Sequence, residues 1–168
     1  MTFLDRVTFD AGQGAHLDGG MRYMFIKPEA LMGLVHHMPQ DMRPALFDAM
    51  AASVFAAGGA SARAYRAAGA QDPGALLATI AATAPQLGWG IWQFTYDGTI
   101  IRLEVRNSPF AAGHGPSDRP VCALIRGMLL AVGGMVLGVP AQVRETDCAA
   151  MGAELCRFEV QAESSPRN

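Results

Sequence analysis

The sequence is poor in charged residues and in cysteine, and each scarcity excludes a class of protein. Charged residues make up 17% of the 168 residues, hydrophobic residues make up 51%, and the formal net charge is −2. This balance gives no electrostatic reason to expect binding to nucleic acid or to an anionic membrane surface. The three cysteines are an odd number without a secretory context, so we expect reduced thiols rather than a disulfide framework.

The chain also lacks a recognisable leader and an uninterrupted apolar run of membrane length. Acidic residues in the opening MTFLDRVTFDAG occupy the place where a signal peptide has its apolar core. The most apolar stretch, Val121 to Val139, is interrupted by Arg126 and falls short of the ~20 apolar residues that cross a bilayer. We therefore expect a buried helix here, no membrane partner and a cytoplasmic location.

Motifs for redox cofactors are missing as well. The sequence contains no GxGxxG fingerprint, no flavin or iron–sulfur motif and no cysteines to spare for a cluster. A hydride-transfer enzyme needs a cofactor that carries this chemistry. Direct catalysis is therefore not expected, and no residue is assigned a catalytic role.

The elements that are present predict one α+β domain, in which helices pack on one face of an antiparallel sheet. We expect an irregular arm over residues 1–20, the domain over 21–162 and a disordered tail over 163–168. The residue patterns predict helices at 28–37, at 43–55 with a break near AAGGAS, at 76–84 and along the apolar stretch, which Asp118 and Pro120 would begin. They predict strands at 22–27, 142–147 and 156–161, and a loop over NSPFAAGHGPSD.

The strongest short-range signal is a β-hairpin. WGIWQFTY and TIIRLEVRN flank Asp97-Gly98, a dipeptide typical of tight hairpin turns. Alternation places Trp92, Phe94 and Tyr96 on one face of the first strand. These three aromatics, with Phe25 on an earlier strand, are candidate lining for an apolar pocket, although aromatics on a strand are more often plain core.

The stretch ETDCAAMGAELC places a glutamate and two of the three cysteines close together. Strand parity gives Glu145 the same inward face as Val143, and Cys156 the same inward face as Phe158. Cys148 follows the first strand directly, and Cys122 lies in the first turn of the apolar helix, where the dipole favours a thiolate.

Three thiolates and a carboxylate form a closed set of four ligands that suits tetrahedral zinc in a structural site. The spacing alone leaves an alternative open, in which the cysteines are small buried hydrophobes and Glu145 is paired with Arg144 or Arg157. His114, in the loop before Cys122, is a candidate substitute ligand.

Residues 107–160 resemble the 4-vinyl reductase domain. The resemblance rests on NS.F before the loop, PVC opening a Gly-rich helix, a G.P break, and E..C...G...C ending in a strand. This family includes the sensor region of phenol- and toluene-responsive activators and stand-alone hydrocarbon-binding proteins. Its fold is similar to ligand-binding domains of nitric-oxide-signalling and Golgi-transport proteins.

The resemblance implies a zinc ion held by Cys122, Glu145, Cys148 and Cys156. It also implies a sensor or carrier module for a small hydrophobic ligand, which can be aromatic. The chain lacks the ATPase and helix-turn-helix segments of the activators and the histidine-bearing segment with which the phenol sensors hold a hydroxyl group.

Two further functions are compatible with the resemblance. One is an accessory or carrier role in (bacterio)chlorophyll or tetrapyrrole biosynthesis, after the family's name. The other is an assembly role, since folds of this type pair through helices, and a homodimer is the expected partner. The stripe Gly127, Ala131, Gly134 and Gly138 on the apolar helix either admits another backbone or leaves space for a ligand.

Overall fold

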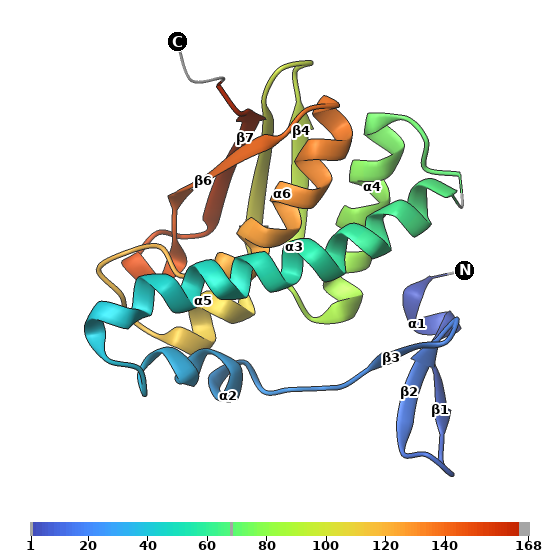
Figure 1. The fold of residues 1–168 in the computed structure, drawn as a ribbon, viewed down its shortest axis with the longest axis horizontal. Helices are drawn as coiled ribbons and strands as arrows, with labels where there is room; N and C mark the ends of the chain where they lie inside the picture. The colour runs from blue at the N-terminus through green and yellow to red at the C-terminus, as the bar shows by residue number, and fades with distance from the viewer. Residues whose placement is uncertain (1, 68, 165–168) are drawn as a thin grey trace.

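The computed structural model describes residues 2–67 and 69–164, which form two antiparallel sheets and a set of helices (Figure 1). The larger sheet has the strand order β4-β5-β7-β6. Its strands are β4 (Ile91–Tyr96), β5 (Ile101–Arg106), β6 (Ala141–Asp147) and β7 (Cys156–Ala162). The predicted hairpin and the final strand pair are therefore confirmed, and β5 and β7 lie at the centre of the sheet.

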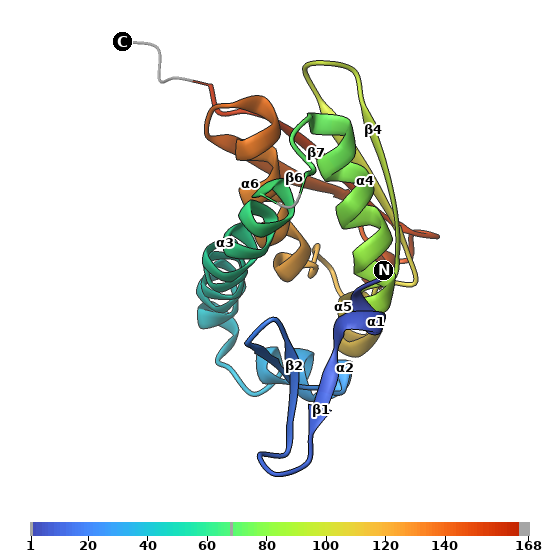
Figure 2. The same ribbon diagram turned by 90° about the vertical axis from the view of Figure 1, so that its right-hand side faces the viewer.

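Helices cover one face of this sheet in two layers. α6 packs on β6 and β7, α4 packs on β4, and α3 lies across α6 on the side away from the sheet (Figures 1 and 2). The helices are α1 (Phe3–Arg6), α2 (Pro28–Met32), α3 (Arg43–Ala67), α4 (Pro73–Thr83), α5 (Pro109–His114) and α6 (Ala123–Leu137). Short 3₁₀ turns occupy Gly33–Val35, Gln40–Met42, Ala84–Leu87 and Ala149–Met151. The expected α+β class is confirmed.

The two faces of the large sheet differ as the alternation predicts. Side chains of β5 and β7 that face α6 are fully buried: Ile101, Leu103, Val105, Cys156, Phe158 and Val160. The opposite face carries ion pairs, including Arg157 with Glu104 at 3.0 Å and Arg144 with Glu159 at 3.1 Å. The apolar face fixes the register, because a shift of one residue would bury these charges.

Glycines bring α3 and α6 into close contact. A Cβ atom on Gly127 would collide with the backbone of Ala51, and one on Gly58 would lie 2.9 Å from Met128. The prediction of a helix break near AAGGAS is therefore wrong: α3 runs without interruption, and its glycines serve packing against α6. Of the two uses left open for the small-residue stripe, Gly127 shows close backbone approach.

The N-terminal region is not the irregular arm that the sequence suggested. Residues 3–23 form α1 and a three-stranded meander of β1 (Thr8–Asp10), β2 (Ala15–Asp18) and β3 (Met21–Tyr23). Asp18 is buried because it pairs with Arg6 at 3.0 Å, and Phe3 packs edge-on against Tyr23. Residue 164 is the last described, so most of the predicted tail lies outside the described residues.

The start of α6 also differs from the prediction. Asp118 and Pro120 precede the helix, and Cys122 is its N-cap residue. The segment predicted as a loop contains α5, which begins because the Ser108 hydroxyl accepts a hydrogen bond from the backbone N–H of Ala111. α5 packs against α2 and places Ser108 beside Cys122.

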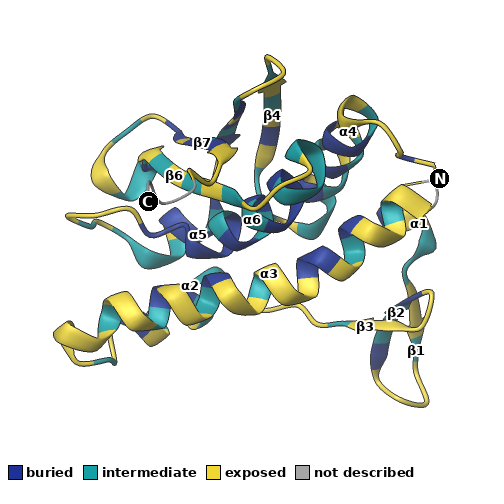
Figure 3. Ribbon diagram, turned by 45° about the horizontal axis from the view of Figure 1, so that its top comes forward, coloured by how far each residue is buried: buried dark blue, intermediate teal, exposed yellow. Residues whose placement is uncertain are grey.

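The predicted burial of the apolar helix is confirmed, since most of α6 is buried between the sheet and α3 (Figure 3). Among the described residues one other segment, Gln40–Ala67, is long and apolar enough to cross a membrane by length and composition. Core helices of soluble proteins pass the same test, and 22% of its most apolar window is buried.

Candidate functional site: a cysteine–glutamate cluster and an apolar cavity

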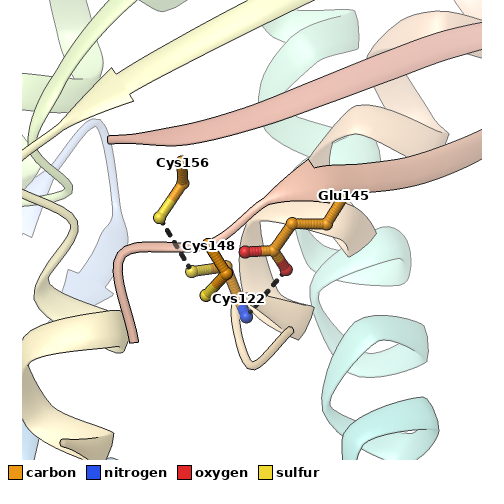
Figure 4. A group of neighbouring side chains, drawn as sticks. All are labelled: Cys122, Glu145, Cys148 and Cys156. Carbon is orange, nitrogen blue, oxygen red and sulfur yellow. Dashed lines mark hydrogen bonds between the residues drawn. The ribbon is translucent and has the colours of Figure 1, made fainter. Parts of the chain in front are cut away.

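Four side chains from three elements meet at the N-terminal end of α6 (Figure 4). They are Cys122, Glu145, Cys148 and Cys156, and one ligand atom from each lies within 4.8 Å of the others. Glu145 comes from β6, Cys148 follows that strand, and Cys156 begins β7. The three thiols are buried, with 1%, 1% and 0% of their surface exposed.

The connection between β6 and β7 shapes this cluster. The strand register shifts between Glu145 and Asp147, and a 3₁₀ turn follows in which Met151 N–H donates to the Cys148 carbonyl at 2.9 Å. Gly152 ends the turn with a φ of 94°, a conformation that favours glycine. The chain then reverses, so that Cys156 returns to a point beside Cys148.

Backbone amides contribute to the same point. The N–H of Cys122 donates to Glu145 Oε2 at 3.1 Å, and the N–H of Ala149 donates to the sulfur of Cys156 at 3.3 Å. The sulfur atoms of Cys122 and Cys156 are 3.6 Å apart. Ser108 Oγ lies 3.4 Å from the sulfur of Cys122, a contact that the sequence pattern did not predict.

Charge is unevenly distributed in the cluster. Hydrogen bonds with Cys148 and Cys156, together with burial, raise the pKa of Cys122, whereas the hydrogen bond with Cys122 lowers the pKa of Cys156. Burial, followed by the hydrogen bond with Cys148, raises the pKa of Glu145 to about 8. Glu145 Oε1 is buried without a hydrogen-bond partner. Four acidic groups so placed require a cation to ionise together.

The residues present fit a metal ion. Zinc–sulfur bonds of about 2.3 Å in a tetrahedron separate two sulfur ligands by roughly 3.8 Å, close to the observed 3.6 Å. The unsatisfied oxygen of Glu145 supplies the fourth donor. The pairing of Glu145 with Arg144 or Arg157 does not occur, because these arginines pair with Glu159 and Glu104. The cluster can therefore hold a metal ion through three thiolates and a carboxylate.

A separate cavity of about 300 Å³ lies between α3, α4 and β4, on the other side of α6. Its walls are mostly apolar: Met24, Val54, Ala57, Gly58, Ala62, Ile80, Ala84, Leu87, Trp89, Trp92 and Met128. Its polar lining consists of Tyr23, Ser61, Tyr65 and Thr83, with no acidic, basic or histidine side chain among the described residues. Such a cavity excludes charged ligands, because their burial would leave the charge uncompensated.

The hydroxyl groups of this cavity differ in their availability. Thr83 donates to the Thr79 carbonyl at 2.8 Å, so its proton is already used. Tyr23, Ser61 and Tyr65 have no side-chain hydrogen bond within residues 2–67 and 69–164. Burial, with Tyr65 as a neighbour, raises the pKa of Tyr23. These three hydroxyls are free to bond a ligand.

Of the four aromatics predicted to line a pocket, Trp92 lines this cavity. It is 5% exposed, and its indole N–H donates to the Trp89 carbonyl at 2.9 Å. Phe94 packs against Trp92 beyond the cavity wall, Tyr96 donates to the Gly98 carbonyl, and Phe25 is 81% exposed. The lining contributed by α3 was not predicted, since nothing in the spacing of its residues marks a cavity.

The histidines lie away from both sites. His114 contacts His36, whose Nε2 lies 2.9 Å from the His114 carbonyl, and it is not part of the cysteine–glutamate cluster. His16 stacks between Phe9 and Phe25 in the N-terminal meander. A substitute ligand role for His114 therefore has no geometric support.

The comparisons with known proteins agree with this geometry. Residues 101–162 match the family model of the 4-vinyl reductase domain. The comparison with curated proteins found no match. Among solved structures, the phenol-responsive sensory domain of the transcription activator PoxR with phenol shares 16% identity over 95% of this chain and 86% of that chain, with a TM-score of 0.78.

Two further structures share the fold at lower similarity. A vinyl-4-reductase family protein from Methanocaldococcus jannaschii has 14% identity over 86% of this chain and 100% of that chain, with a TM-score of 0.53. A trafficking protein particle complex subunit 3 from Naegleria fowleri, covalently bound to palmitic acid, has 12% identity over 84% and 98%, with a TM-score of 0.54. The resemblance seen in the sequence is confirmed: the chain contains a 4-vinyl reductase domain over residues 101–162, in a fold shared with the PoxR sensory domain and with a vinyl-4-reductase family protein.

Proposed function

We propose that this chain is a zinc-stabilised module that binds a small, neutral, largely apolar molecule and acts as a sensor or carrier. The observation that carries the proposal is the cavity between α3, α4 and β4, whose described lining has no charged side chain. Its volume of about 300 Å³ is at the lower end of ligand pockets and favours a ligand of one or two rings. The match to the 4-vinyl reductase domain and the likeness to the phenol-responsive sensory domain support the same class of function.

Zinc is the metal that best suits the cluster, because three thiolates and one carboxylate with no open position form a closed tetrahedral site. Such a site holds α6 to the turn between β6 and β7 and takes no part in a reaction. A module without catalytic activity, in the cytoplasm and paired with a second copy, is the form in which we expect the protein to act.

The proposal is tested by thermal shift and calorimetry with phenol, toluene, benzoate and palmitate. A ligand that binds only the folded state at about 100 times its Kd stabilises it by about 2.7 kcal/mol. We expect phenol and toluene to raise the melting temperature and benzoate to have no effect, because the cavity offers no cation. No response to either neutral ring would contradict the proposal. A porphyrin titration that changes the Soret band would favour the tetrapyrrole carrier instead.

Elemental analysis and native mass spectrometry of the purified protein test the metal. One zinc per chain is the expected result. A fully folded protein without metal would contradict the structural role of zinc while leaving the ligand proposal intact.

A further inference from the structure

A groove on the outer side of the helical layer is separate from the metal cluster and from the ligand cavity. It lies between α3 and α6, where Gly134 and Gly138 of α6 leave the floor low. The α3 residues along it are Asp48, Ala51, Ala52, Phe55, Ala56, Gly59 and Arg63. The outer side of α3 is exposed along most of its length (Figure 3), although most of these residues are apolar.

The α3 side of this groove has its charges at opposite ends. Asp48, Ala52, Phe55, Gly59 and Arg63 follow one another at intervals of four, three, four and four, which places them in one stripe along the helix. Asp48 is 71% exposed at one end, and Phe55 is 50% exposed in the middle. Arg63 at the other end has no ion pair in the part of the chain that the structure describes.

This stripe is complementary to itself when reversed. In an antiparallel pair of α3 helices related by a two-fold axis between Phe55 and Ala56, Asp48 of each copy faces Arg63 of the other. Ala52 then faces Gly59, and each Phe55 packs over Ala56 of the second copy. The two charges are 15 residues apart, or about 22 Å along a helix, so both ion pairs form at once. Small residues at the centre allow the helix axes to approach to about 8 Å.

We propose that this stripe is the interface of a homodimer in which two α3 helices pack antiparallel across the α3–α6 groove. A C2 interface uses the same patch on both copies, as this charge arrangement requires. Asp48 already contacts Arg126 at 2.6 Å, yet its exposed carboxylate accepts a second donor. The inference specifies the surface of the expected homodimer and is independent of ligand binding, because the cavity opens on the other side of α3.

The test uses two single charge reversals, Arg63→Glu and Asp48→Arg, with sedimentation velocity as the measurement. Each variant alone places like charges at both ends of the pair, and we expect its dimer dissociation constant to rise at least tenfold, or about 1.4 kcal/mol. An equimolar mixture of the two variants forms both ion pairs again, so we expect the dimer to return in the mixture. Phe55→Asp should give monomers that no mixture rescues.

Arg106→Glu is the matched control, because Arg106 is exposed on β5, on the opposite side of the molecule. It should leave the dimer intact, and circular dichroism and zinc content should be unchanged in all variants. A monomeric wild-type protein at micromolar concentration would overturn the proposal, as would a dimer insensitive to both reversals or unrestored by mixing. Flotation with phosphatidylcholine–phosphatidylglycerol vesicles that is lost in Phe55→Asp would assign the groove to a membrane and overturn it as well.

Discussion

The cysteine–glutamate cluster and the apolar cavity are built from opposite kinds of side chain, although α6 contributes to both. At its N-terminal end, Cys122 joins three other acidic groups within 4.8 Å. Further along the helix, Met128 lines a cavity whose described walls carry no charged group. The same helix therefore separates a site that demands a cation from one that rejects ions.

The two sites also differ in how the chain assembles them. Three of the four cluster residues lie between positions 145 and 156, in a single strand–turn–strand unit. The cavity draws its lining from residues between 23 and 128, on several different segments. A compact unit specifies its chemistry locally, whereas a cavity depends on packing across the whole domain, so changes at the two sites should have separable effects.

Removal of the metal should have the largest effect. In Cys148→Ser, or after treatment with a strong chelator, we expect loss of zinc and of cooperative unfolding, because binding energies of structural zinc on the order of 10 kcal/mol match the whole stability of a domain. Circular dichroism melts with zinc analysis provide the measurement. Met151→Ser is the control, since Met151 is 49% exposed in the same turn. A Cys148→Ser protein that melts like the wild type would show that the cluster is not structural.

Filling the cavity should abolish ligand binding without affecting the metal. Ser61 lines the cavity from α3, and Ser61→Phe places an aromatic ring in the space of about 300 Å³. We expect a fall in toluene affinity of about 100-fold or more, as when a ligand's own volume is occupied, with one zinc still bound. Calorimetry measures the affinity. Ala64→Phe adds the same ring at an exposed position of α3 and should bind toluene normally; equal affinities in the two variants would place the ligand elsewhere.

Much of this contrast was visible in the sequence, and the reasons are physical. Asp97-Gly98 marked the hairpin because a tight turn needs these residues, and strand parity aimed Glu145 and Cys156 at the same interior point. The resemblance added Cys122, which lies far from the others in sequence. Local signals and a compact unit thus predicted the sheet and the cluster.

The features that the sequence did not predict depend on packing between distant elements. Gly58 suggested a helix break, but it accommodates Met128 from α6. Asp118 suggested a helix start, yet the N-cap of α6 is Cys122, whose N–H is held by Glu145 across the fold. The cavity was assigned to strand aromatics, and its free hydroxyls on α3 were missed because Ser61 and Tyr65 carry no signal of their partner elements.

Loss of the Ser108 hydroxyl should weaken metal binding to an intermediate degree. Ser108 lies 3.4 Å from the sulfur of Cys122, and removal of such a supporting contact typically costs roughly 10- to 100-fold, or about 1.4 to 2.7 kcal/mol, in metal affinity. Competition with a zinc chelator measures this change in Ser108→Ala. Because Ser108 also caps α5, the matched control is Asp72→Ala, which removes the cap of α4 far from the cluster. Equal zinc affinity in both variants would limit Ser108 to helix capping.

The smallest expected effect separates the hydroxyl groups of the cavity from its apolar walls. Tyr65 has a hydroxyl without a partner in the described residues, and Tyr65→Phe removes that oxygen while preserving the ring. A neutral hydrogen bond contributes about 0.5–1.5 kcal/mol, so phenol should bind roughly 2- to 10-fold more weakly. Toluene, which has no hydroxyl, should bind as before and serves as the internal control in the same calorimetric series. If both ligands weaken equally, Tyr65 shapes the cavity wall and the polar contact belongs to Tyr23 or Ser61, the two hydroxyls that remain free.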